Sequence, residues 1–294
     1  MLYDRIDHIV LPIRSLEVAA EPFARLGLAL YPGVRHEGRG TENRGFFVGG
    51  PTNEFYVELL GIYDAAAART AGLSAYVDSA AETHGLASVV LRVDDMAATA
   101  NALTPRGLKL EPQEVYATDG RKVCDVASLG DPAQSLVELR VIQYPDSGPD
   151  RSRRHSEAGH LNHTFPLKRL DHLAAVAPDL EAATRYWTDV LGIPPTGEVV
   201  NPAIIIRQFQ IGDAIIELLG PATPDSPIAQ RPPGPASMAA FEVDDLDAAV
   251  AAARQAGFSP PDPAPGPLPN TRTATIPAAE LSGLGLQLLQ YNER

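Results

Sequence analysis

The chain has 294 residues, 45% of them hydrophobic, and a formal net charge of −13 at pH 7. The length suits two domains of about 150 residues, each with its own core. The acidic balance argues against nucleic-acid binding, which needs clustered Lys and Arg, and a single cysteine, Cys124, excludes an intrachain disulfide framework. No signal-peptide pattern opens the chain, and no apolar run reaches about 18 residues. We therefore expect a cytoplasmic protein that does not enter membranes.

In chain order, the first unit is predicted to be a strand, a helix and three further strands. Ser15 is a suitable N-cap for the helix, and Gly27 ends it. A glycine-rich polar loop is expected at 33–45, and an Ala-rich stretch at 62–84 is expected to form a helix or a lid over a cleft. The expected elements are the strand 6–13, the helix 16–26 and the strands 28–31, 46–49 and 55–60.

The same order of elements restarts three more times. Glu138 follows Ser88 by 50 positions and Gln287 follows Met238 by 49, which is close to the spacing in the first unit. Repetition at a nearly fixed period predicts four βαβββ modules. The later strands are expected at 86–93, 108–116, 121–127, 135–141, 170–176, 204–210, 214–219, 236–243 and 285–290. The later helices are expected to begin after a cap at Asp94 or Asp95, at 179 and at 246.

The repeats predict two domains joined by a linker. They are an N-terminal domain over 1–144 (modules 1–61 and 85–144), a linker over 145–167 and a C-terminal domain over 168–294 (modules 168–221 and 235–294). The linker is rich in Pro, Gly, Ser and charge and lacks periodicity, so we interpret it as a solvated tether. His84, just before a strand, is interpreted as a loop residue. The tether carries Arg151, Arg153, Arg154, His155, His160 and His163.

A pair of short motifs is repeated in the two halves of the chain. An apolar strand entered by Asp-His is followed, some way along the sequence, by an apolar strand with one Glu inside it. Glu58 follows His8 by 50 positions, and Glu217 follows His172 by 45. Imidazole and carboxylate groups on strands are suitable metal ligands. The repeated set therefore suggests a metal site.

At this point the sequence resembles the vicinal oxygen chelate superfamily of glyoxalases, bleomycin-resistance proteins and dioxygenases. The C-terminal half, with RLDHLAAVAPDLEAATRYWTDVLGI and AAFEVDDLDAAVAAARQAGF, is similar to methylmalonyl-CoA epimerases. The N-terminal half, with GVRHEGRGTENRGFFVGG before YVELLG, resembles glyoxalase-like domains. The resemblance implies an α+β fold in which four βαβββ modules form two curved eight-stranded mixed sheets. It also implies a divalent metal in the cleft, held by the first and last strand of each module.

Mapped onto this chain, the resemblance implies a mixed set of ligands. If neighbouring modules pair, as four-module families mostly do, each cleft keeps one His. A crossed pairing of modules one and three would instead unite two His and two Glu. The first-strand positions are His8, Ser88, His172 and Met238, and the last-strand positions are Glu58, Glu138, Glu217 and Gln287. The candidate metal ligands are therefore His8, Glu58 and Glu138 in one cleft, and His172, Glu217 and Gln287 in the other.

Such donors suit Zn, Mn, Co, Ni or Fe(II), and the identity of the metal stays open. The ion would polarise a carbonyl of a small oxygen-rich substrate and stabilise an enolate, with Glu138 or Glu58 as the catalytic base. Asp7 and Asp171, each just before a His, are expected to point to the opposite face of their strands as structural residues.

The polar loop at 33–45 is predicted to clamp an anionic substrate over the first cleft, because Arg binds carboxylate and phosphate with two parallel hydrogen bonds. The alternative is an ordinary glycine-rich surface loop. The candidate substrate-binding residues are Arg35, His36, Arg39, Thr41, Asn43 and Arg44.

The sequence therefore predicts a metal-dependent lyase or isomerase of the glyoxalase or epimerase type, with the N-terminal cleft active. One alternative is a metal-free binding protein of the bleomycin-resistance kind, favoured by the loss of two His. A further alternative is an extradiol-type dioxygenase, which needs two His and one carboxylate and hence the crossed pairing. A small-molecule substrate is the expected partner, and both a monomer and a homodimer fit this fold.

Overall fold

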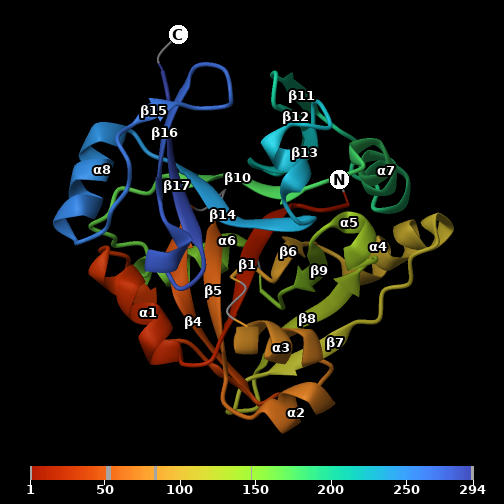
Figure 1. Ribbon diagram of the computed structural model, residues 1–294. Coiled ribbons are helices and arrows are strands. Elements are labelled where there is room, and N and C mark those ends of the chain that lie inside the picture. The colour runs from red at the N-terminus through yellow and green to blue at the C-terminus, as the bar shows by residue number, and fades with distance from the viewer. Residues whose placement is uncertain (1, 51–53, 83–84, 147, 293–294) are drawn as a thin grey trace.

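The protein is described by a computed structural model that covers residues 2–50, 54–82, 85–146 and 148–292. Two curved sheets lie one above the other, with helices packed around and between them (Figure 1). His84 lies outside the described residues. The strands of the first half are β1 (Arg5–Ile13), β2 (Leu30–Tyr31), β3 (Arg35–His36), β4 (Thr41–Val48), β5 (Phe55–Ile62), β6 (Ser88–Arg92), β7 (Gln113–Tyr116), β8 (Lys122–Leu129) and β9 (Glu138–Gln143).

Two helices of the first half begin at residues that the sequence predicted as caps. Ser15 accepts a hydrogen bond from the Val18 amide at the start of α1, and Asp95 caps α4 through the Ala98 amide. The helices of the first half are α1 (Leu16–Arg25), α2 (Ala65–Thr70), α3 (Ser74–Glu82), α4 (Met96–Leu103), the 3₁₀ turn η1 (Thr104–Arg106), α5 (Pro132–Ser135) and α6 (Gly148–Glu157).

The second half repeats this order of elements. Its strands are β10 (Arg169–Val176), β11 (Gly197–Val200), β12 (Ile204–Ile211), β13 (Ala214–Pro221), β14 (Gly234–Glu242), β15 (Ala264–Pro265), β16 (Thr271–Ile276) and β17 (Gly285–Tyr291). Its helices are α7 (Leu180–Arg185), the π-helical turn η2 (Tyr186–Val190), α8 (Leu246–Gln255), and the 3₁₀ turns η3 (Pro227–Gln230) and η4 (Ala278–Glu280).

Neighbouring modules pair in both sheets. The first sheet has the order β2-β4-β5-β1-β6-β9-β8-β7 with the short β3 beside β4, and the second has β11-β12-β13-β10-β14-β17-β16-β15. In each, the first strands of two modules meet antiparallel (β1 with β6, β10 with β14), and each runs parallel to the last strand of its own module. The predicted α+β fold is confirmed, and the crossed pairing is wrong.

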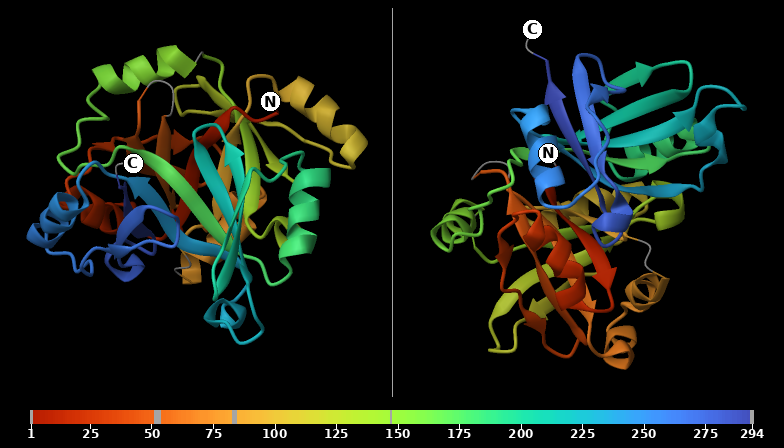
Figure 2. Two further views of the ribbon diagram at one scale, coloured as in Figure 1. Left: turned by 90° about the horizontal axis from the view of Figure 1, so that it is seen from above. Right: turned by 60° about the vertical axis from the view of Figure 1, so that its left-hand side comes forward.

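One hydrophobic core joins the two halves. Trp187 of η2 is fully buried, and its indole N–H donates to the Ser135 carbonyl of the first half at 3.2 Å. The ring of Phe55 lies 6.0 Å from that of Phe241 between the sheets, and a single cluster of buried apolar residues runs through both halves. The two sheets therefore pack as layers of one body (Figure 2), whereas the sequence predicted a separate core for each domain.

The segment interpreted as a solvated tether is ordered, and that interpretation is wrong. Residues 148–157 form α6, in which Arg151 and Ser152 are buried. After the helix, His163 accepts from the Ala29 amide through Nδ1 at 2.9 Å and approaches the Phe47 carbonyl through Nε2 at 2.5 Å. A short polar segment with three arginines is typical of a solvent-exposed loop. This segment packs against the protein instead, because Arg151 lies beside the buried carboxylates of Asp7 and Glu54.

The polar loop predicted at 33–45 is largely a hairpin. Strand β3 pairs with the start of β4, and β4 begins at Thr41 rather than near residue 46. Its polar residues obscured the strand pattern because several of them face a cavity instead of a packed core. None of the described helices has the length and apolar character that crossing a membrane requires.

Candidate functional site

A cavity of about 420 Å³ lies against the first sheet. Its walls come from β1, β4, β5, β6, β8 and β9, and from helices α3 and α6. The volume falls within the range usual for small-molecule sites. The cavity is therefore the place to examine for chemistry.

A chain of three polar side chains reaches from the buried sheet into this cavity. The Asp7 carboxylate lies 2.7 Å from His8 Nδ1, and His8 Nε2 lies 3.5 Å from Glu58 Oε2. All three residues are buried. The His8 ring stacks on Tyr56 at 4.3 Å, and Asn43 donates to Glu58 at 2.6 Å. These contacts fix the orientation of both the imidazole and the carboxylate.

A β-bulge explains why Asp7 and His8 can act together. Across β1 and β6, Ile6 pairs with Leu91 and His8 with Val90, which leaves Asp7 as an extra residue. An extra residue of this kind breaks the strict alternation of side chains. The expectation that Asp7 points to the opposite face is therefore wrong. The same shift at Asp171, in the pairing of β10 with β14, corrects the expectation there too.

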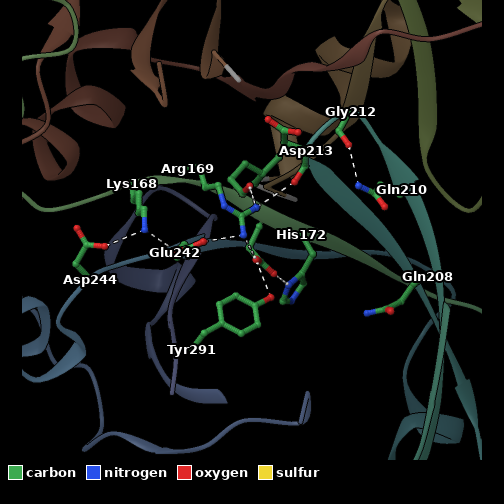
Figure 3. Close-up of polar contacts among 12 residues, drawn as sticks. Lys168, Arg169, His172, Gln208, Gln210, Gly212, Asp213, Glu242, Asp244 and Tyr291 are labelled. Carbon is green, nitrogen blue, oxygen red and sulfur yellow. Dashed lines mark hydrogen bonds and ion pairs between the residues drawn. The ribbon is translucent and has the colours of Figure 1, made fainter. Parts of the chain in front are cut away.

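The second sheet carries a copy of this arrangement, and Figure 3 shows its His172 with Gln208 and Tyr291 nearby. Asp171 lies 2.8 Å from His172 Nδ1, and His172 Nε2 lies 3.8 Å from Glu217 Oε2. Gln208 donates to Glu217 at 2.8 Å, and Tyr291 donates to Asp171 at 3.0 Å. The paired motifs of the sequence therefore fold into two equivalent His–Glu pairs, one on each sheet.

The surroundings shift the pKa of Asp7 in the first sheet and of His172 in the second. Burial alone would raise the pKa of Asp7, but the Arg151 guanidinium and hydrogen bonds from His8 and Tyr144 hold it well below its usual range. Burial alone would lower the pKa of His172, yet the hydrogen bond with Asp171 and the carboxylate of Glu217 leave it raised. Both aspartates act as fixed negative partners of a histidine.

The strand register places Arg140, not Glu138, at the last-strand position of the second module. His172 pairs with Ala240, whose parallel partner is Gln287. In the first sheet His8 pairs with Val90, whose parallel partner is Arg140. The spacing that assigned this position to Glu138 is therefore wrong by two residues, because the loops differ in length between modules. Glu138 instead binds Arg140 at 2.7 Å.

Four of the six predicted substrate-binding residues line the cavity, and two do not. His36, Arg39, Thr41 and Asn43 line the cavity. Arg35 instead binds Glu42 at 2.9 Å and lies over the ring of Tyr63. Arg44 follows Asn43 on β4, where alternation directs it to the other face of the strand.

Sequence reasoning missed several residues of the cavity wall. Tyr31, Tyr76 and Arg140 line it, and α6 contributes Arg151 and His155. Arg140 had a signal in the sequence, because the strand VELRV places Glu and Arg on one face with apolar residues on the other. No pattern in the sequence indicated that Arg151 and His155 of α6 would line the cavity. Cys124 is buried in this wall, and burial raises the pKa of its thiol to about 12.

Residues 6–169 match the family described as glyoxalase-like domain, and residues 169–288 match the Glyoxalase/Bleomycin resistance protein/Dioxygenase superfamily. The chain belongs to the vicinal oxygen chelate superfamily. Among its relatives is the mitochondrial methylmalonyl-CoA epimerase of Mus musculus, 32% identical over 136 residues, which are 44% of this chain and 76% of the mouse protein. The human epimerase is 34% identical over 90 residues, 29% of this chain and 51% of that protein.

Two solved structures share the fold of nearly the whole chain. A mutant 4-hydroxymandelate synthase from Streptomyces coelicolor is 15% identical, with a TM-score of 0.66 over 99% of this chain and 94% of that one. A hypothetical protein from Staphylococcus aureus is 14% identical, with a TM-score of 0.65 over 97% of this chain and 98% of that one. At these identities the likeness concerns the fold alone.

The N-terminal cleft of this superfamily member does not fit the implied metal ion. His8 and Glu58 supply two donors, but nowhere in the described ranges do three His, Cys, Asp or Glu residues gather as a metal site would require. The Arg140 guanidinium lines the same cavity and would repel a divalent cation. The C-terminal cleft fits better, because Gln287 hydrogen-bonds His172 and adds an amide to His172 and Glu217.

Proposed function

We propose that the N-terminal cleft is the active site of an isomerase or lyase that moves a proton next to a carbonyl group of a small anionic substrate. The observation that carries this proposal is the buried Glu58 carboxylate, which faces a cavity beside His8 Nε2 at 3.5 Å. A buried carboxylate costs free energy unless it has a partner or a task. Glu58 has an oriented imidazole beside it and open space in front of it.

The contacts of His8 support proton transfer at this pair. Asp7 holds Nδ1 of the imidazole, so Nε2 is the nitrogen left to exchange a proton with Glu58. Glu58 would take the proton from carbon, and His8 would keep that proton within reach for its return. A positioned general base of this kind contributes about 10²- to 10⁴-fold to the rate.

The charge that develops on the substrate oxygen would be met by arginine. Removal of a proton beside a carbonyl leaves an enolate, and donors already in place stabilise it without reorganisation. Arg39 and Arg140 line the same cavity as Glu58. The curated relatives are named as epimerases, a kind of isomerase, which agrees with this type of reaction.

A metal-dependent form of the chemistry belongs to the C-terminal cleft in this proposal. His172, Glu217 and the Gln287 amide would hold the ion, and the hydrogen bond of Asp171 to Nδ1 is the support usual for a metal-bound imidazole. A bound divalent ion would supply Lewis-acid polarisation of a carbonyl.

A second candidate is the metal-free binding protein, and the Arg140 position favours it. An arginine in place of a ligand suits a cavity that only retains an anion. The dioxygenase alternative needs two His in one cleft, whereas β1 and β10 lie in different sheets, so the topology favours the other two candidates over it.

Deuterium incorporation from D₂O, followed by proton NMR, tests the proposal. The probes are malonyl-type half-thioesters and 2-oxo acids, each measured with EDTA and with added Zn, Mn, Co, Ni or Fe(II). We expect exchange of the proton next to the carbonyl in the wild type, and a loss of at least about 100-fold in Glu58→Gln. Glu217→Gln is the matched variant in the other cleft and should keep the exchange that is measured in EDTA.

Two results would overturn the proposal. Loss of exchange in Glu217→Gln with full activity in Glu58→Gln would move the active site to the C-terminal cleft. Stoichiometric binding of a probe with no exchange under any metal condition would leave the sequestering protein as the function.

A further inference from the structure

The cavity is strongly cationic although the chain is acidic. Its wall holds six cationic side chains and only two carboxylates, Glu58 and Asp146, whereas the chain as a whole has a net charge of −13. A concentration of one sign of charge in a cleft attracts ligands of the opposite sign. The cationic side chains are Arg39, Arg121, Lys122, Arg140, Arg151 and Arg154.

Five of these six cations have carboxylate partners in the protein. Lys122 lies 2.8 Å from both Glu114 and Asp125. Arg154 pairs with Asp146, and Arg151 lies 3.7 Å from Asp7 and 3.9 Å from Glu54. Arg121 reaches Asp119 only at 3.8 Å, where both side chains are exposed. Arg140 pairs with Glu138 through Nε and Nη2, and its Nη1 takes no part in that pair. Arg39 and the Nη1 group of Arg140 are therefore the cationic donors left for a ligand.

Arg39 has no carboxylate partner in the described part of the chain. Its hydrogen bond goes to the amide oxygen of Gln113 at 3.4 Å. Burial and the positive charge of Arg140 together lower the pKa of Arg39. Both residues line the same cavity, where an anion would be attracted by the two guanidinium groups together.

Arg140 is held ready for such an anion. Glu138 binds its Nε and Nη2 atoms at 2.8 and 2.7 Å, and the guanidinium lies 4.8 Å above the ring of Tyr76. The Tyr76 hydroxyl in turn lies 2.6 Å from Ser88 Oγ. Arg140 lines the cavity and is thereby fixed by other residues, and its Nη1 takes no part in the pair with Glu138.

Another polar atom in the cavity is unsatisfied. The buried Tyr31 hydroxyl finds no hydrogen-bond partner within residues 2–50, 54–82, 85–146 and 148–292. Buried hydroxyls nearly always have a partner. Tyr31 lines the same cavity as Arg39, with its hydroxyl buried in the wall beside the site.

We propose that Arg39 and Arg140 form a two-guanidinium receptor for a carboxylate of the substrate, at the place where the fold was expected to hold a metal ion. The substrate class is a small carboxylate whose reacting C–H lies next to the carbonyl and near that carboxylate. This inference names the substrate class for the proposed function and rests on it for the reaction. The anion binding itself does not require turnover.

Calorimetric titration of malonate into metal-stripped protein in EDTA tests the receptor. Inorganic phosphate is titrated in parallel to distinguish a carboxylate site from a general anion site. We expect the wild type to bind malonate more tightly than phosphate, and Arg39→Gln and Arg140→Gln to weaken malonate binding about tenfold or more. Arg69→Gln is the control, because Arg69 forms an exposed pair with Asp78 at 2.6 Å.

Arg140→Lys separates loss of the receptor from loss of the fold. It keeps the charge and should retain part of the affinity, because a lysine lacks the planar fork that matches a carboxylate. Far-UV circular dichroism of each variant should be unchanged. Malonate binding that requires an added divalent ion, or that is unaltered in both Gln variants, would overturn the receptor, as would stronger binding of phosphate.

The Glu58→Gln variant distinguishes the receptor from the reaction. It should bind malonate at least as tightly as the wild type, because a negative charge near the anion is removed. Malonate binding without deuterium exchange would defeat the proposed function and leave the receptor standing. Deuterium exchange without malonate binding would do the reverse.

Discussion

At the scale of single residues, Asp7 shows how one buried charge organises the site. It contacts His8 at 2.7 Å and accepts from Tyr144 at 2.9 Å, and the Arg151 guanidinium lies 3.7 Å away. A buried carboxylate is tolerated only when its lone pairs are satisfied in this way. In return it fixes which nitrogen of His8 faces Glu58. Asp171 has the same role, with Tyr291 and Arg169 as partners.

Replacement of this aspartate should alter both stability and its pH dependence. Asp7→Asn is expected to lower the free energy of unfolding by about 3 kcal/mol at pH 7, because it breaks a buried charge network. The pKa of Asp7 is depressed on folding, so its contribution is complete above the unfolded pKa of about 4. That contribution is lost as the pH falls further toward the folded pKa.

Urea unfolding at pH 7, 5, 4 and 3 measures this effect. The difference between wild type and Asp7→Asn should stay constant from pH 7 to 5 and shrink below about pH 4. Asp78→Asn removes a carboxylate from an exposed pair and should change stability by less than about 1 kcal/mol. A difference for Asp7→Asn that does not vary with pH would contradict the assigned ionisation.

At the scale of elements, helix α6 closes one side of the N-terminal cleft. It follows β9 and leads toward the second half, and it contributes Arg151 and His155 to the cavity wall. His155 stacks on Phe47 at 3.9 Å. The helix is therefore part of the site as well as the connection between the halves.

The two faces of α6 should respond differently to mutation. Arg151→Leu is expected to cost about 3–5 kcal/mol in the free energy of unfolding, because Asp7 and Glu54 lose their buried cation. Arg153→Leu lies on the exposed face of the same helix, where its pairs with Asp150 and Glu157 contribute little. Chemical denaturation measures both, and equal effects of the two substitutions would show that α6 does not pack as described.

At the scale of the whole molecule, the two sheets share a core. Tyr3 donates to the Leu191 carbonyl at 2.8 Å, and Ser282 donates to that of Ala19 at 3.0 Å. With Trp187 buried against Ser135, these contacts cross between the halves at several places. The domain boundaries at 1–144 and 168–294 stay predictions, as does a homodimer.

A shared core predicts one cooperative unfolding transition. Trp187, the single tryptophan of the chain, reports on the second half by fluorescence, and circular dichroism reports on the whole chain. The two signals should change together with denaturant. Trp187→Ala should cost about 3–5 kcal/mol, and malonate should raise the midpoint of both signals by the same amount. Two separate transitions would indicate independent domains.

The sequence alone determined the modular fold. Apolar periodicity and the repeated order of elements predicted the strands, and the prediction that neighbouring modules pair is confirmed. The repeated motifs also indicated that His8 lies near Glu58 and His172 near Glu217. Each pair does so because its two residues lie on adjacent parallel strands of one module. These features depend on local patterns and short pairings, which a single sequence records well.

Which residues line the cleft, and hence its chemistry, depends on contacts that exist only in the folded chain. Loop lengths set the register that puts Arg140 at the position assigned to Glu138, and spacing along the chain does not reveal register. A β-bulge directs Asp7 toward His8. Helix α6 packs against the first sheet, where Arg151 is the cationic partner of the buried Asp7 carboxylate. Each of these features depends on contacts between residues that are far apart in the sequence. Such contacts stabilise the protein only after the sheets have formed and buried the charged groups.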